Sequence, residues 1–203
     1  MNSESIEAMY WSEARRKIEG LRSASKDPLV QQIVEKGLVE LALKEGMLSN
    51  PSISTDLTTY SPIKRVGMFV FVHQTAEVDW LYTDGAFQIN AGDEYLNVHI
   101  PPAEEGAVSL ANVTNDYTRM AEYTRDFLPN LKYLVGITYA RLARTGKRQN
   151  YTSFPIDVPQ ELRAPMKAMY ERYINVAQNG KPPGPTVLSY HTRKSFLDQF
   201  GVK

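Results

Sequence analysis

A histidine near the end of an apolar run is the first residue that could do chemistry. His99 lies at the end of the stretch EYLNVHI, whose β-branched and aromatic residues predict a strand, and two prolines follow directly. A neutral imidazole there could accept a proton from an amine as a general base. The plainer alternative is a half-buried strand histidine bonded to a backbone group. One residue of register decides which way the ring points.

A basic stretch is the second candidate. The segment 139–148, YARLARTGKR, predicts a helix, and Arg141, Arg144 and Arg148 recur in it at spacings of three and four. Such a face could bind an anionic ligand through charge-assisted hydrogen bonds. The alternative is a solvated helix face without a ligand.

Several other kinds of site have no support in the sequence. The chain has no cysteine, which excludes disulfides, thiolate metal ligands and a cysteine nucleophile. Its 3 histidines stand far apart and form no pair at metal-ligand spacing, so we expect no metal site. No Gly-x-Ser-x-Gly turn, phosphate-binding loop or Gly-x-Gly-x-x-Gly fingerprint is present.

Composition and charge are those of an ordinary globular protein. The chain has 203 residues, of which 42% are hydrophobic, and 23 Lys and Arg balance 23 Asp and Glu. A balanced charge favours neither a nucleic acid nor an anionic membrane surface as partner. The N-terminal stretch is charged throughout, and no window approaches the roughly 20 apolar residues that span a bilayer. We therefore expect a soluble, cytoplasmic protein with neither a nucleic acid nor a membrane as partner.

The first part of the chain predicts a helical extension. Apolar residues recur at helical spacing in two stretches before residue 48, which the break SKDP separates. A linker rich in Ser, Thr and Pro follows from Ser49 to Pro62. We therefore divide the chain into a helical extension and linker over residues 1–60 and a second domain over residues 61–203. The apolar faces of the helices must be buried, and a homodimer is one way to do so.

The second domain begins as a meander and then alternates between strands and helices. Strands are predicted over 64–73, 77–83, 86–90 and 94–100, with a hairpin turn at Asp84 and Gly85. Beyond them, the pattern predicts helices over 110–128, 139–148, 160–180 and 193–200, and strands over 132–138, 151–159 and 186–190. This order indicates an α+β fold with a mixed central sheet flanked by helices.

The order of elements over about residues 64–200 resembles the GNAT superfamily of N-acyltransferases. In that family the fourth and fifth strands splay apart around the thioester of an acyl-coenzyme A, and a loop before the next helix presents backbone N–H groups to the pyrophosphate. EYLNVHI and KYLVGIT correspond to those strands, and AEEGAV, residues 103–108, corresponds to the loop. The resemblance implies an acyl-CoA as co-substrate. The residues that it places on the coenzyme are Ile100, Gly106, Ala107, Arg141, Arg144 and Arg148.

The sequence departs from the family's motifs at two places. The loop lacks the expected Gln or Arg and the last small residue, and Glu104 and Glu105 lie beside the phosphate position. Two unit charges about 5 Å apart at an effective dielectric near 20 repel by roughly 3 kcal/mol. In addition, Gly146 stands where the family often has the tyrosine that protonates the departing thiolate. Tyr139 and Tyr151 are the phenols nearest to that position in the sequence.

Three interpretations stay open. The first is transfer of an acyl group from an acyl-CoA to an amine, with His99 as base and Tyr139 as proton donor. The second is a binding or structural module of the same fold without catalysis, which the paired glutamates and the missing tyrosine favour. The third is an unrelated α+β fold, for which the resemblance implies nothing about a coenzyme.

Overall fold

The computed structural model describes residues 53–80, 82–99, 110–157 and 184–201, together with scattered residues between 16 and 31. The chain divides into two compact units, Met1–Asn50 and Pro51–Lys203. The predicted N-terminal helical pair falls largely outside the described residues, as do the predicted helix over 160–180 and the loop over 103–108. The division at residue 60 and the homodimer stay predictions.

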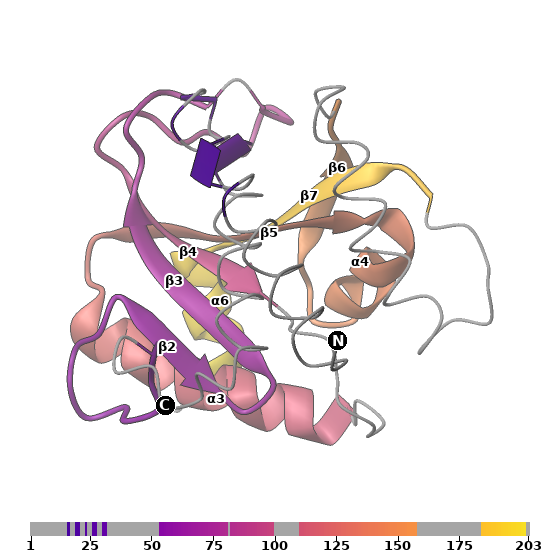
Figure 1. Cartoon of the computed structure of the whole chain (residues 1–203). Coiled ribbons are helices and arrows are strands. Elements are labelled where there is room, and N and C mark those ends of the chain that lie inside the picture. Colours follow the sequence, from indigo (N-terminus) through magenta and orange to yellow (C-terminus); the bar gives the residue numbers. More distant parts are fainter. Residues whose placement is uncertain are drawn as a thin grey trace, which may run out of the picture. The chain divides into compact units, whose positions relative to one another are not determined.

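A mixed sheet of seven strands, in the order β1-β2-β3-β4-β5-β7-β6, dominates the described part of the second unit (Figure 1). The strands are β1 Ile53–Ser54, β2 Ile63–Val66, β3 Phe69–Thr75, β4 Glu94–His99, β5 Leu131–Tyr139, β6 Thr152–Pro155 and β7 Thr186–Thr192. β1 is parallel to β2 and β4 is parallel to β5, while the other neighbours are antiparallel. The α+β class and the mixed central sheet predicted from the sequence are therefore confirmed.

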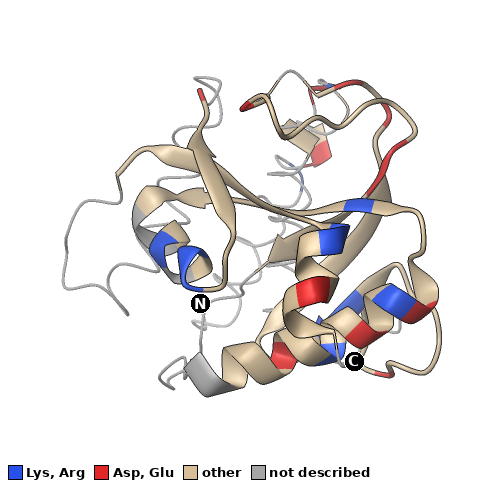
Figure 2. Ribbon diagram, turned by 180° about the vertical axis from the view of Figure 1, so that it is seen from behind, with Lys and Arg blue, Asp and Glu red and all other residues tan. Residues whose placement is uncertain are grey.

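Two helices, α3 (Leu110–Phe127) and α6 (Arg193–Phe200), cover one face of this sheet, which Figure 2 presents toward the viewer. Met120 and Tyr123 of α3 and Phe196 of α6 are buried in one cluster with Phe71 and Leu134 of the sheet. α3 ends directly before Leu128 and Pro129, and the hydroxyl of Thr192 caps α6 by accepting from the Ser195 N–H. The apolar face and the caps explain why both helices follow the prediction closely.

A second apolar cluster lies on the opposite face. Adjacent residues of β5 alternate between the faces, so Leu134 lies in the first cluster and Val135 in the second. Trp80 and Phe87 of the segment 76–93 pack there with Tyr190 of β7. The Tyr190 hydroxyl also donates to the Asp84 carboxylate over 3.1 Å. The segment 76–93 is therefore held against the sheet, although it adds no strand among its described residues.

The predicted single strand over 64–73 is wrong, because a turn at Gly67 and Met68 divides it into β2 and β3. Gly67 has φ +55°, and a Cβ there would lie 2.0 Å from Oδ2 of Asp116 on α3. The same carboxylate oxygen accepts the Met68 N–H at 3.1 Å. A buried carboxylate of α3 therefore occupies the space that only glycine leaves open, and it fixes the turn.

The predicted strands over 77–83 and 86–90 are also wrong, although Gly85 adopts φ +89° as a turn there requires. Asp84 accepts the N–H groups of Ala86 and Phe87 at 3.0 and 2.8 Å. In the same way, Asp79 accepts the N–H of Ala91 at 2.8 Å, and Asp93 accepts the N–H of Asn90 at 2.7 Å. These side chains take N–H groups that a ladder would use, and the two halves of the segment are joined by isolated backbone bonds such as that from the Trp80 N–H to the Ile89 carbonyl at 2.8 Å. The described residues of the segment therefore form no strand.

Candidate functional site

The ladder between the parallel strands β4 and β5 ends before either strand does. Its last pair is Asn97 with Val135, although β4 continues to His99 and β5 to Tyr139. β5 meanwhile stays paired with β7 as far as Tyr139. The backbone pairing of these two central strands therefore stops before their carboxyl ends, where the sequence resemblance implies that a thioester would lie; we call this unpaired end the parting of β4 and β5.

Gly136 is the first residue of β5 beyond the last pair. A Cβ added to it would lie 3.3 Å from the Val98 carbonyl oxygen, which is tighter than an ordinary van der Waals contact. Glycine therefore allows the backbones of β4 and β5 to stay close where the ladder ends. A side chain there would push the two strands further apart.

His99 and Tyr139 lie on the same side of the sheet, on the two strands that part. Asn97 and Val135 are ladder partners and so share a face, and every second residue along each strand returns to that face. His99 is only 3% exposed, while Tyr139 is half-buried. The structure thus answers the question of register for His99: its ring lies on the face of Val135 and opposite α3 and α6.

Asn97 is a candidate that reasoning from the sequence missed. Its side chain is 2% exposed, and Nδ2 has no hydrogen-bond partner among the described residues. Leaving a buried donor unsatisfied costs about 1–3 kcal/mol. An amide two residues before His99, in a run of apolar side chains, was the signal available in the sequence. The unsatisfied N–H group lies at the last ladder pair, on the same face of the sheet as His99.

The basic helix α4 (Ala140–Lys147) follows β5 directly and confirms the predicted helix, but it ends one residue before Arg148. The chain then turns tightly, with the Tyr151 N–H donating to the Gly146 carbonyl and Asn150 at φ +58°. Arg144 and Arg148 are both exposed, and Figure 2 marks the basic residues of α4. Arg148 thus lies in the turn and not on the helical face predicted for it, whereas the side chain of Arg141 is not among those described.

Tyr151 belongs to the core and not to the parting strands. Its ring lies 4.3 Å from that of His191 and 5.9 Å from that of Tyr117, measured between centroids. Gly146 leaves the space for it, since a Cβ there would touch Tyr151 at 3.5 Å. Complete burial raises the pKa of Tyr151 well above its usual value. Of the two phenols considered from the sequence, only Tyr139 lies on a strand beside the parting.

The remaining residues predicted to contact a coenzyme, Ile100, Gly106 and Ala107, lie outside the described residues, as do Glu104 and Glu105. The contacts predicted for them stay predictions. No described group of three or more His, Asp or Glu side chains could hold a metal ion. Among the helices that are described, none combines the length and apolar character needed to cross a membrane.

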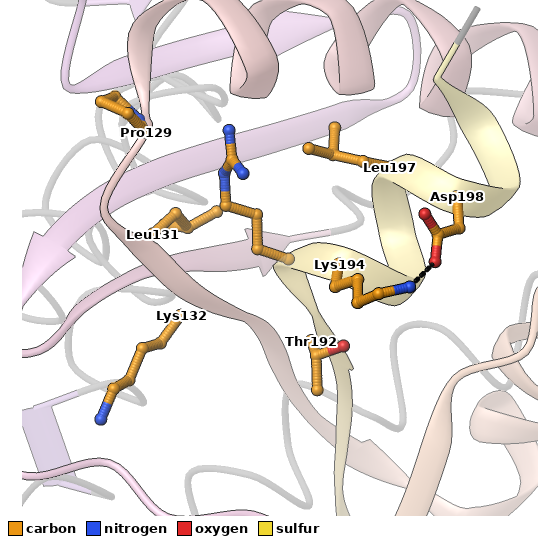
Figure 3. A pocket seen from close by; sticks show the side chains of 8 residues that line it. Pro129, Leu131, Lys132, Thr192, Lys194, Leu197 and Asp198 are labelled. Atoms are coloured by element: carbon orange, nitrogen blue, oxygen red, sulfur yellow. Dashed lines mark hydrogen bonds and ion pairs between the residues drawn. The ribbon is translucent and has the colours of Figure 1, made fainter. Parts of the chain in front are cut away.

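A shallow hollow of about 560 Å³ lies at the other end of β5 (Figure 3). It is lined by Pro129, Leu131, Lys132, Thr192, Arg193, Lys194, Leu197 and Asp198. Each of its cations has a partner: Lys132 bonds Asp93 at 2.8 Å, Lys194 bonds Asp198, and Arg193 donates to the Leu128 carbonyl. Because these charges are already engaged, we do not place the functional site there.

Comparison with known proteins assigns no family. No family model matches the chain, and no curated protein and no solved structure is significantly similar to it. The class that the fold itself defines is an α+β protein with a mixed sheet, in which the parallel ladder of β4 and β5 ends before the two strands do.

Proposed function

We propose that the protein is a GNAT-like acyltransferase, which transfers an acyl group from an acyl-CoA to an amine. The observation that carries the proposal is the ladder of β4 and β5, which stops at Asn97 and Val135 while both strands continue. The sheet order supports it, because the parting lies at the centre of the sheet and between the two strands that the sequence resemblance selects.

The side chains beside the parting provide the base and the acid that acyl transfer from a thioester to an amine requires. The amine nitrogen attacks the thioester carbonyl carbon, a C–N bond forms, and the C–S bond breaks. His99, in its neutral form, takes the proton from the amine, and Tyr139 gives a proton to the departing thiolate. The backbone N–H of Ile100 polarises the carbonyl, and Asn97 Nδ2 donates to a carbonyl of the acyl or pantetheine chain.

The residues that follow β4 and β5 bind the phosphates of the coenzyme. The backbone N–H groups of Gly106 and Ala107 bind the pyrophosphate at the start of α3. Arg141 and Arg144 on α4 and Arg148 beyond it bind the remaining phosphate charge. Arg144 and Arg148 are exposed, as a ligand arriving from solvent requires.

The second candidate function is a module of the same fold that binds a ligand without catalysis. Glu104 and Glu105 favour it, because carboxylates next to a pyrophosphate repel it. Gly146 favours it as well, because glycine cannot donate a proton to a departing thiolate. In this case Asn97 still binds the ligand, while His99 and Tyr139 take no part in a reaction.

The test is calorimetric titration of the purified chain with acetyl-CoA and with coenzyme A, repeated on Arg144→Glu. Charge-assisted contacts contribute about 1.5–3 kcal/mol, so the reversal should weaken binding by at least about tenfold. Arg119→Glu is the matched control, because it makes the same charge change at an exposed site on α3.

Three outcomes distinguish the interpretations. Binding that Arg144→Glu alone weakens, with acyl transfer to an amine in a screen, supports the acyltransferase. Binding without any transfer supports the non-catalytic module. Absence of heat with either ligand, in a protein with native circular dichroism, would refute a coenzyme site.

A further inference from the structure

A second group of reactive side chains lies at the far end of β4 from His99. The Tyr60 hydroxyl is 3.0 Å from Nδ1 of His73, and Nε2 of His73 is 3.1 Å from Oε2 of Glu94. Tyr60 belongs to the loop before β2, His73 to β3 and Glu94 to β4. Glu94 begins β4 and His99 ends it, so about 17 Å of strand separates this group from the site proposed above.

One arrangement of protons satisfies both hydrogen bonds with a neutral His73 ring. An ionised carboxylate only accepts, so Glu94 requires a proton on Nε2 of His73. In the neutral ring Nδ1 is then bare, and it accepts the proton of the Tyr60 hydroxyl. A hydroxyl that donates to a base, which a third group orients, is the arrangement that activates a nucleophile in enzymes.

The elements around the group hold it in place. Ser61, next to Tyr60, bonds the Tyr123 hydroxyl of α3 through both its N–H and its carbonyl, at 3.0 and 2.7 Å. Lys64 of β2 is buried and donates to the carbonyls of Asp56 and Thr59 in the same loop. The loop that carries Tyr60 is therefore anchored to both β2 and α3.

The proposed nucleophile, Tyr60, is the most exposed residue of the group, and the base, His73, is the least exposed. Tyr60 is 53% exposed, the side chain of Glu94 is 29% exposed and that of His73 only 14%. The phenol thus faces solvent, while the imidazole behind it is shielded. Among the large apolar and aromatic side chains that the structure describes, Tyr60 is the exposed one.

We propose that Tyr60 is a nucleophilic acyl acceptor, activated by His73 and oriented through Glu94, whose substrates are uncharged activated acyl esters. The Tyr60 oxygen attacks the carbonyl carbon, a C–O bond forms, and the bond from carbon to the leaving alcohol or phenol breaks. The phenolic proton moves to Nδ1 of His73 and then to the leaving oxygen. The product is an aryl ester on Tyr60, which water or an amine can cleave.

The local charge selects the class of substrate. The carboxylate of Glu94 bonds the imidazole that bonds Tyr60, and the carboxylate of Asp56 belongs to the same loop as Tyr60. Lys64 of β2 is buried and donates to carbonyl oxygens of that loop. A phosphate or carboxylate would be repelled here, whereas a neutral ester is not.

The experiment is incubation of the full chain with p-nitrophenyl acetate, followed by release of p-nitrophenolate and by peptide mass spectrometry. A positioned general base accelerates a step by about a hundredfold or more, so Tyr60 should be acetylated about a hundredfold faster than the phenol of N-acetyl-tyrosinamide. Tyr60→Phe should abolish the ester at this position. His73→Gln should reduce its rate to that of the free phenol.

Glu94→Gln tests whether the carboxylate charge of Glu94 assists proton transfer to His73 or whether Glu94 only supports the fold. The amide keeps the shape and a hydrogen bond to Nε2 but removes the charge, so the acetylation rate should fall by about tenfold at unchanged thermal midpoint. Labelling of Tyr60 no faster than the free phenol would overturn the proposal, as would equal rates in His73→Gln. Neither result depends on coenzyme binding, so failure here is distinguishable from failure of the proposed acyltransferase.

Discussion

Replacing Asn97 by Leu should stabilise the protein and weaken ligand binding at the same time. The amide is 2% exposed, and its Nδ2 is without a partner among the described residues. An unsatisfied buried donor costs about 1–3 kcal/mol, and leucine has the same number and branching of side-chain heavy atoms without that donor, although its methyl groups need more space. Some of the gain is offset by any bond that Oδ1 loses. We therefore expect the free energy of unfolding to rise by about 1 kcal/mol.

Asn97→Leu should weaken binding of the ligand. If Asn97 Nδ2 donates to a carbonyl of the acyl or pantetheine chain, Asn97→Leu leaves that carbonyl unsatisfied in a buried place. A loss of about 1–2 kcal/mol corresponds to a dissociation constant raised by about fivefold to thirtyfold. Urea denaturation measures the first quantity and calorimetric titration with acetyl-CoA measures the second.

Thr124→Val is the matched control for this prediction. Thr124 on α3 is fully buried, and its hydroxyl likewise has no partner among the described residues, but it lies on the opposite side of the sheet from the Asn97 face. It should stabilise by a similar amount and leave acetyl-CoA binding unchanged. A destabilised Asn97→Leu protein would refute the reasoning, because it would mean that the amide is satisfied in the native state.

Two further predictions concern the fold that positions the site. Gly67→Ala should lower the free energy of unfolding by about 2–4 kcal/mol, because alanine is strained at a left-handed φ and its Cβ displaces the Asp116 carboxylate. Gly85→Ala has the same kind of φ but open space around the Cβ, so it should lower the free energy of unfolding by only about 1–2 kcal/mol. Equal losses for the two variants in urea denaturation would contradict the role of Asp116. Burial lowers the pKa of His191, although its bond to the Gln149 carbonyl opposes this, so the unfolded chain binds the proton more tightly. The stability that this group contributes is therefore present above the unfolded pKa of about 6.5 and declines as the pH falls below it. His191→Gln should flatten the slope of unfolding free energy between about pH 7 and 5, and an unchanged slope would count against the buried neutral ring.

The helices α3 and α6 could be predicted because their signals are local. α3 ends where Pro129 approaches, and α6 begins after the Thr192 cap, so sequence spacing alone placed both helices. The division of β2 from β3 could not be predicted in this way. It depends on a carboxylate of Asp116, which lies far along the chain and reaches the Gly67 turn only in the folded sheet.

The candidate site likewise has features that the sequence predicts and features that depend on the folded sheet. Sequence patterns selected the strand that ends in His99 and the helix that carries Arg144, since both are local features. They did not give the face on which His99 lies, because register follows from pairing with Val70 on β3 and from the last pair with β5 at Asn97. Nor did they give the Tyr60 group, whose members come from three separate elements.

β4 connects the two proposed sites and makes them separable by experiment. Its first residue, Glu94, orients His73, and Asn97 and His99 near its other end lie beside β5. Glu94 and Asn97 lie three strand residues apart, about 10 Å, and changes beyond about 7–10 Å without shared partners usually act independently. Glu94→Gln should therefore leave acetyl-CoA binding intact, and Asn97→Leu should leave acetylation of Tyr60 intact. If either change altered both activities, the sheet would couple the sites through β4. A Glu94→Gln/Asn97→Leu double variant would then give the coupling energy, which additivity predicts to be below about 0.5 kcal/mol.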